Sequence, residues 1–138
     1  MIVVDTDVIA YAFIRHDAKR VALSDMVTRK DRHWVVPPLW ISEFRNVLVC
    51  LIRFGGLDPD EARRIVVGAE SQLVGRIVAV YSPDVLSLSA RSGRTAYDCE
   101  YVAAAKSLGT RLVTGDRALA AAFPETAVTM EDFVSGAG

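Results

Sequence analysis

Cysteine and histidine are scarce in this sequence, which has only two of each in 138 residues. Cys50 and Cys99 are too few and too far apart to indicate a disulfide framework or a thiolate metal site. His16 and His33 stand in basic segments away from the acidic motifs of the chain, so we expect neither a zinc site nor an acid-base pair built on histidine. Any chemistry must therefore come from other side chains.

Long apolar runs and a strong net charge are also missing. The sequence is 51% hydrophobic, yet no uninterrupted stretch approaches the roughly 18 apolar residues that a membrane span needs, so we expect no membrane association. No basic segment followed by a long apolar stretch opens the chain, which predicts no export signal and a cytoplasmic location. The formal net charge of −1 gives no overall attraction to nucleic acid, so any such binding must rest on local basic patches.

The length fits one domain, which we place at residues 1–134, followed by a frayed tail at 135–138. Short apolar segments alternate with longer segments whose apolar residues recur at helical spacing. This alternation predicts an α/β fold with a short, mainly parallel sheet. The expected strands are 2–4, 34–36, 77–80, 111–113 and an edge strand at 127–128.

Four acidic residues follow the ends of these strands or begin the helices that leave them. Asp5 comes directly after the first strand, and Asp116 stands three residues after Val113. In open parallel sheets, ligands bind outside the carboxyl ends of the strands, and right-handed crossovers keep those ends on one edge. Glu43, early in the helix after the second strand, and Asp98, in the first turn after a Thr95 cap, should lie near the same edge.

Four carboxylates at one edge would repel one another unless a cation were present, and hard divalent ions such as Mg²⁺ or Mn²⁺ prefer oxygen ligands. Such a site suits phosphodiester cleavage by a metal-activated water. Each acid also has an ordinary interpretation. Asp116 can simply cap the helix through Ala118, and Asp98 can simply favour the positive end of its helix. For Asp7 we expect capping of a helix that starts at Val8 rather than metal ligation.

Four stretches of the chain carry a resemblance to a known family. They are IVVDTDVIA around Asp5, VPPLWISEFRNVL around Glu43, TAYDCEYVAAAKSLG around Asp98 and RLVTGDRAL around Asp116. The sequence resembles PIN-domain nucleases over essentially its whole length, and is most similar to the VapC toxins of bacterial toxin-antitoxin operons. The pairing of Asp-x-x-Tyr-x-x-x-Ala with Leu-Val-Thr-Gly-Asp is the most specific part of this match.

The resemblance implies a three-layer α/β/α, Rossmann-like fold and an endoribonuclease that depends on Mg²⁺ or Mn²⁺. It also implies a homodimer and a VapB-like antitoxin whose C-terminal segment lies along a helical groove. The residues it implies are the catalytic acids Asp5, Glu43, Asp98 and Asp116, of which Asp5, Asp98 and Asp116 bind the metal, with Thr6, Asn46 and Thr114 as supporting polar residues.

Basic residues near the acids are candidates for RNA binding. Arg91 and Arg94 precede Asp98, and Arg15 begins a basic segment that extends to Arg20. Because an acidic site needs flanking cations to hold a polyanion, we expect Arg15, Arg91 and Arg94 to bind RNA phosphates. Nothing in the sequence indicates which RNA is cleaved.

Two other functions fit parts of the sequence. An apolar strand followed by Asp-x-Asp also resembles the haloacid dehalogenase-like phosphatases, in which Asp5 would be the nucleophile and Asp7 the general acid. Those enzymes also need a late acidic pair, whereas the late strand here ends in Thr-Gly-Asp with no second acid close by. The other alternative is a catalytically idle PIN module that binds RNA or protein.

Overall fold

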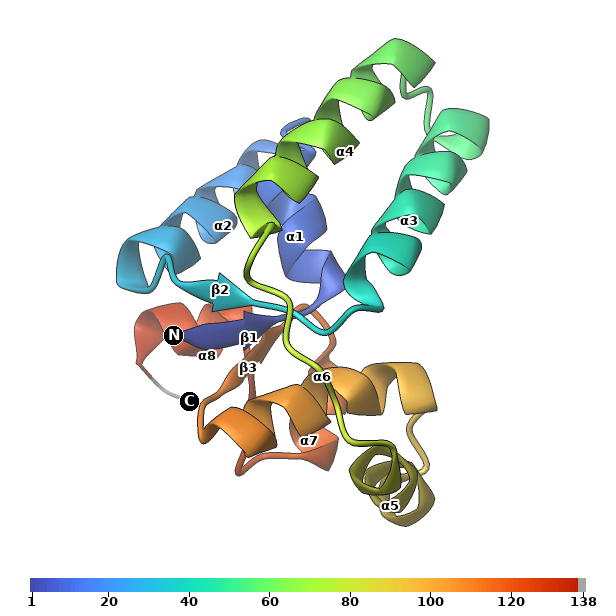
Figure 1. The fold of residues 1–138 in the computed structure, drawn as a ribbon. Coiled ribbons are helices and arrows are strands. Elements are labelled where there is room, and N and C mark those ends of the chain that lie inside the picture. The colour runs from blue at the N-terminus through green and yellow to red at the C-terminus, as the bar shows by residue number, and fades with distance from the viewer. Residues whose placement is uncertain (137–138) are drawn as a thin grey trace.

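Four short parallel strands form the centre of the protein (Figure 1). A computed structural model describes residues 1–136. The strands lie in the order β2-β1-β3-β4, with Val3 opposite Val35, Val4 opposite Val113 and Thr114 opposite Thr129. The α/β fold with a parallel sheet is thereby confirmed. The strands are β1 (Ile2–Val4), β2 (Trp34–Val35), β3 (Leu112–Thr114) and β4 (Ala127–Thr129).

Helices cover both faces of this sheet, which gives the three layers expected for the fold (Figure 1). None of the helices within residues 1–136 is both long and apolar enough to cross a membrane. The first face is covered by α1 (Thr6–Phe13), α2 (Ala18–Lys30), α3 (Trp40–Phe54), α4 (Pro59–Leu73) and α8 (Met130–Ser135), and the second face by α5 (Ser82–Ser92), α6 (Ala96–Leu108) and α7 (Arg117–Ala122).

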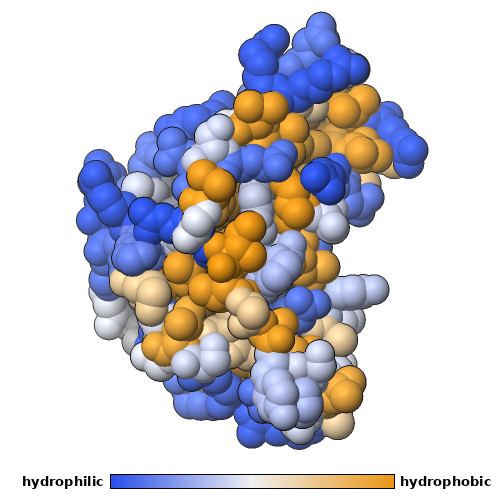
Figure 2. Space-filling view, in the orientation of Figure 1, coloured by the Kyte–Doolittle hydropathy of each residue, from blue (hydrophilic) through white to orange (hydrophobic). Residues whose placement is uncertain are grey.

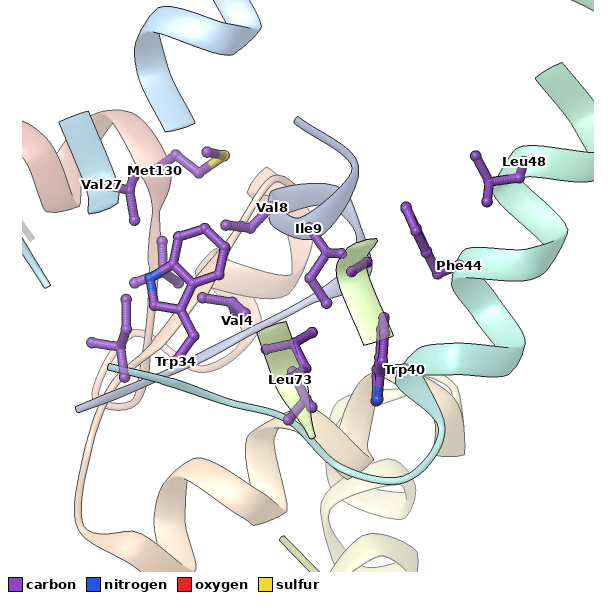
Figure 3. Packing of buried hydrophobic residues seen from close by; sticks show 14 of the residues in the cluster. Val4, Val8, Ile9, Val27, Trp34, Trp40, Phe44, Leu48, Leu73 and Met130 are labelled. Atoms are coloured by element: carbon purple, nitrogen blue, oxygen red, sulfur yellow. The ribbon is translucent and has the colours of Figure 1, made fainter. Parts of the chain in front are cut away.

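Alternation along the strands divides the apolar core in two. Val4 and Val113 point to the first face, whereas Val3 and Leu112 point to the second, because successive side chains of a strand lie on opposite sides of the sheet. Figure 3 shows the first cluster, in which helical residues pack around β1 and β2. Both faces of β1 are fully buried, which explains why the strand is continuously apolar.

The predicted strand at 77–80 is wrong. Only one bridge forms there, between Ile77 and Val36, and the Val78 N–H donates to the Val36 carbonyl at 2.8 Å. The segment connects α4 on one face with α5 on the other, so it crosses the edge of the sheet instead of running along it (Figure 1). Ile77 is 51% exposed, whereas Val78 and Val80 are partly buried against the core of the second face without forming a strand.

The C-terminal region contains a helix that the sequence pattern did not indicate. Thr129 caps α8 by accepting a hydrogen bond from the Asp132 N–H at 3.2 Å. Buried Met130 packs this short helix against the core of the first face. Ser135 is the last residue of α8, and of the tail expected at 135–138, residues 137 and 138 lie outside the described part of the chain.

Candidate active site

Asp5 follows β1 directly and is held by the start of α1 and the end of β3. Its Oδ1 accepts a hydrogen bond from the Val8 N–H at 3.2 Å, and its Oδ2 accepts one from the Thr114 hydroxyl. The residue is only 7% exposed. Burial raises the pKa of Asp5 to about 7, although the bond from Thr114 acts in the opposite direction. A cation beside this carboxylate would stabilise its ionised form.

Asp116 combines the capping role with a second contact. Its backbone N–H donates to the Thr114 hydroxyl at 2.9 Å, which connects it to the side chain that holds Asp5. Its Oδ1 caps α7 by accepting from the N–H groups of Ala118 and Leu119. Its Oδ2 accepts a 2.7 Å hydrogen bond from Arg94. Helix capping therefore uses one oxygen of this carboxylate and leaves the other facing the acidic edge.

Asp98 lies in the first turn of α6, whose cap at Thr95 is as expected. The Asp98 N–H donates to the Thr95 hydroxyl at 3.1 Å. Its Oδ2 accepts from Arg94 at 2.9 Å, and the same nitrogen of Arg94, Nη2, also donates to Asp116. Asp98 and Asp116 are thus joined by one guanidinium group.

Glu43 on α3 is held by two hydroxyl groups from other elements. Its Oε1 accepts from the Tyr101 hydroxyl at 2.6 Å and from the Thr6 hydroxyl at 2.8 Å. Thr6 follows Asp5, and Tyr101 lies three residues after Asp98 on the same face of α6. Burial, followed by the bond to Glu43, raises the pKa of Tyr101, so its phenol stays protonated as a donor.

The expectation that Asp7 caps a helix from Val8 is wrong. The helix starts at Thr6 and Asp5 caps it, because a carboxylate directly after the strand already reaches the free N–H of Val8. Asp7 lies instead in the first turn. Asp7 is exposed by surface area, and its pKa is raised by partial desolvation and then by the negative charges of Asp116, Glu43 and Asp98. Asp7 is therefore a fifth acid beside the four predicted ones, two residues after Asp5.

The remaining predicted residues lie outside this network. Asn46 is exposed on α3, three residues after Glu43. Arg15 forms an exposed ion pair with Asp25. Nη2 of Arg91 lies 3.7 Å from Oε1 of Glu125. Within residues 1–136, Arg94 is therefore the one predicted RNA-binding arginine that is bonded to the acids.

The donor set fits a hard divalent cation in its chemistry. It consists of carboxylate oxygens, and burial or mutual repulsion raises the pKa values of Asp5 and Asp7, which an added positive charge would reverse. As the side chains stand, however, no group of three or more His, Cys, Asp or Glu residues within positions 1–136 is arranged to hold a metal ion. Between Asp98 and Asp116, the positive charge is supplied by Arg94.

A parallel three-layer α/β fold with acids gathered at the carboxyl ends of its strands defines the class of this protein. Residues 2–123 match the PIN domain family, and the chain belongs to that family. PIN domains are generally nucleases, so membership supports a nuclease. The family resemblance of the sequence motifs is thereby confirmed.

Solved structures with the same fold include PAE2754 from Pyrobaculum aerophilum. It is 25% identical, with a TM-score of 0.75, over 99% of this chain and 95% of that one. FitAcB from Neisseria gonorrhoeae is 21% identical, with a TM-score of 0.67, over 95% and 99% of the two chains. A structure of FitAB bound to an IR36 DNA fragment is 21% identical, with a TM-score of 0.65, over 94% and 95%. No curated protein matches the chain.

Proposed function

We propose that this protein is an endoribonuclease that depends on Mg²⁺ or Mn²⁺ and acts as the VapC-like toxin of a toxin-antitoxin pair. The observation that carries the proposal is the network around the acids. Thr114 links Asp5 with Asp116, and Arg94 links Asp116 with Asp98. A second set of bonds ties Glu43 to the residue after Asp5 and to the helix of Asp98. Acids from four distant segments are thereby held at one edge of the sheet.

We assign the carboxylates of Asp5, Asp98 and Asp116 as the residues that would hold the metal. When bound, such an ion lowers the pKa of a water and neutralises charge on a phosphate. Both hydroxyl donors to Glu43 use Oε1, so we assign Oε2 to the orientation and deprotonation of the attacking water. Thr6 and Tyr101 keep that carboxylate fixed, and Thr114 orients Asp5. Asn46 remains a proposed supporting residue on the exposed side of α3.

The proposed activity is tested with purified protein freed of any antitoxin. We expect structured RNA to be cleaved in Mg²⁺ or Mn²⁺ and to stay intact in EDTA. Asp5→Asn and Asp98→Asn should each reduce cleavage by at least about 100-fold, whereas Asp84→Asn, an exposed acid in the first turn of α5, should not. Cleavage that persists equally in the first two variants would contradict the assigned centre.

A DNA fragment is the appropriate second substrate in the same assay, because the FitAB structure contains one. RNA cleavage with no DNA cleavage supports the proposed substrate class. Equal cleavage of the two would restrict the proposal to a nuclease without preference for RNA.

The phosphatase alternative is not favoured by the end of β3. Such an enzyme needs a late pair of acids there, whereas Asp116 follows β3 and Gly115 with no second acid beside it in the sequence. Asp7 lies in a group of five carboxylates, which differs from the Asp-x-Asp arrangement of a phosphatase. The idle PIN module also remains an alternative, and the cleavage assay with EDTA distinguishes it from an active nuclease.

We also propose a cytoplasmic homodimer that is inhibited by a VapB-like antitoxin. Exposed apolar side chains in α3, in α4 and directly after α4 support a protein partner at these two helices (Figure 2). Phe54 is 86% exposed, Val67 62% and Val74, directly after α4, 75%. Sedimentation of the purified protein tests the dimer. A gene for a small DNA-binding protein next to this one, whose product suppresses the RNA cleavage, would identify the antitoxin.

A further inference from the structure

Arg94 lies in the short connection between α5 and α6, and hydrogen bonds hold the backbone of this connection in place. Gly93 ends α5 with a positive φ of 74° that favours glycine. The Arg94 N–H then donates to the Ser92 hydroxyl at 3.1 Å, and its carbonyl accepts from the Ser89 hydroxyl at 2.6 Å. The next residue, Thr95, caps α6. The start of the side chain is therefore fixed in place, while its four bonds beyond Cα can still rotate.

The guanidinium group of Arg94 bridges two carboxylates and forms a bidentate pair with neither of them. An arginine paired with one carboxylate normally donates two parallel hydrogen bonds. Here the single nitrogen Nη2 donates both to Asp98, at 2.9 Å, and to Asp116, at 2.7 Å. Meanwhile Arg94 Nε is buried and has no hydrogen-bond partner. The unpaired Nε–H makes this conformation of Arg94 less stable. The side chain keeps it because the guanidinium is attracted to both Asp98 and Asp116.

The geometry points to Arg94 as an internal counter-ion that exchanges with the divalent cation. The inference rests on the proposed nuclease function, because it concerns the same acids. Asp98 Oδ2 and Asp116 Oδ2, which accept from Arg94, belong to two of the carboxylates assigned to the metal. A guanidinium and a divalent ion would repel each other strongly at one pair of carboxylates. Binding of the ion therefore requires that the Arg94 side chain move away.

This exchange has a measurable consequence for metal affinity. When a binding-competent state is populated only part of the time, the apparent Kd rises by the inverse of that fraction. If the bridge is closed about nine-tenths of the time, the wild-type protein binds Mn²⁺ about tenfold more weakly than a protein without the bridge. Removal of the arginine should therefore strengthen metal binding, which is the opposite of what loss of a merely structural residue would do.

The experiment is calorimetric titration of Mn²⁺ into RNA-free protein. Arg94→Gln should bind Mn²⁺ about tenfold more tightly than the wild type. The matched control is Arg63→Gln, which removes an exposed arginine of α4 that pairs with Asp60, and it should leave the affinity unchanged. An Arg94→Gln affinity equal to or weaker than a measurable wild-type affinity overturns the exchange and leaves the nuclease proposal intact. Absence of Mn²⁺ binding from both proteins contradicts the proposed function and the exchange with it.

A measurement on the wild-type protein keeps the inference testable if Arg94→Gln does not fold. Nuclear magnetic resonance follows the Nε–H of Arg94 while Mg²⁺ is added. We expect its exchange with water to become faster as the buried group moves into solvent, whereas the Nε–H of exposed Arg63 should not change. An unchanged Arg94 signal at Mg²⁺ saturation would overturn the exchange.

Discussion

The hydroxyl of Tyr101 donates a 2.6 Å hydrogen bond to Oε1 of Glu43, although the two residues are 58 positions apart in the sequence. The Thr6 hydroxyl donates to the same oxygen at 2.8 Å. Tyr101 is only 2% exposed, so its hydroxyl is shielded from water, whereas Glu43 is partly exposed, and the bond joins α6 to α3. Because Asp98 and Tyr101 share one face of α6, the bond also sets the position of Asp98 relative to Glu43.

Tyr101→Phe should therefore weaken both folding and catalysis. The ring packing is kept, but Glu43 loses one of its two donors, and a hydrogen bond to a charged group contributes about 2 kcal/mol. We expect the free energy of unfolding in urea to fall by about that amount and RNA cleavage to fall as well. The control is Tyr97→Phe on the same helix, where the side chain is 61% exposed and the stability should not change. Equal stability of both variants would contradict the role assigned to Tyr101.

The raised pKa of Asp5 predicts a dependence of stability on pH in metal-free protein. The folded protein keeps the Asp5 proton up to about pH 7, whereas the unfolded chain loses it near pH 4. The contribution of Asp5 to stability is thus fully present below about pH 4 and is lost as pH rises through 7. Asp5→Asn has no proton to lose, and its side chain can still cap α1.

In EDTA, Asp5→Asn should therefore become more stable relative to the wild type as pH rises from 4 to 8. The pKa shift of about three units sets an upper limit of about 4 kcal/mol on this gain. Urea unfolding at several pH values measures it. A difference between the two proteins that stays the same at pH 5 and pH 8 would show that Asp5 is not buried as an acid.

Gly115 should resist substitution because it packs against α1. A Cβ added at Gly115 would lie 2.7 Å from Cβ of Asp7 and 3.0 Å from its Oδ2. Gly115→Ala must push the turn after β3 away from α1, and overpacking of this kind costs about 1–3 kcal/mol. Gly68→Ala in α4 is the matched control, because nothing lies within 4 Å of the added methyl group and alanine favours helix. Thermal unfolding that ranks Gly115→Ala as the more stable variant would refute the contact.

Arg15 and Arg91 remain the predicted RNA contacts on the surface, where each has an acidic neighbour. The affinity for RNA falls as salt rises, and loss of one phosphate-binding arginine makes the slope of log affinity against log salt less steep by about 0.7 for a single strand. Arg15→Gln and Arg91→Gln should each cause a decrease of this size in catalytically inactive Asp98→Asn protein. Arg63→Gln serves as the control. Slopes that match the control in both variants would remove these two arginines from the RNA site.

The acids and most of the strands could be predicted because their signals are local. Val3 and Val4 form an uninterrupted apolar pair before Asp5, and such a pattern indicates a strand buried on both faces. The same kind of signal failed at residues 77–80, since an apolar segment that crosses between layers has the same composition as a strand. Helix α8 was missed because its six residues carry little periodicity and its one start signal, Thr129 three residues before Asp132, is a weak one without it.

The sequence by itself determined that the chain is an α/β protein and that Asp5, Glu43, Asp98 and Asp116 follow or flank strand ends, because strand period and helix caps depend on neighbours along the chain. Only the tertiary structure decided which groups each acid faces. It placed Arg94 between Asp98 and Asp116, and Tyr101 against Glu43. Such contacts join residues that are distant in sequence and depend on how the helices pack, so no local pattern encodes them.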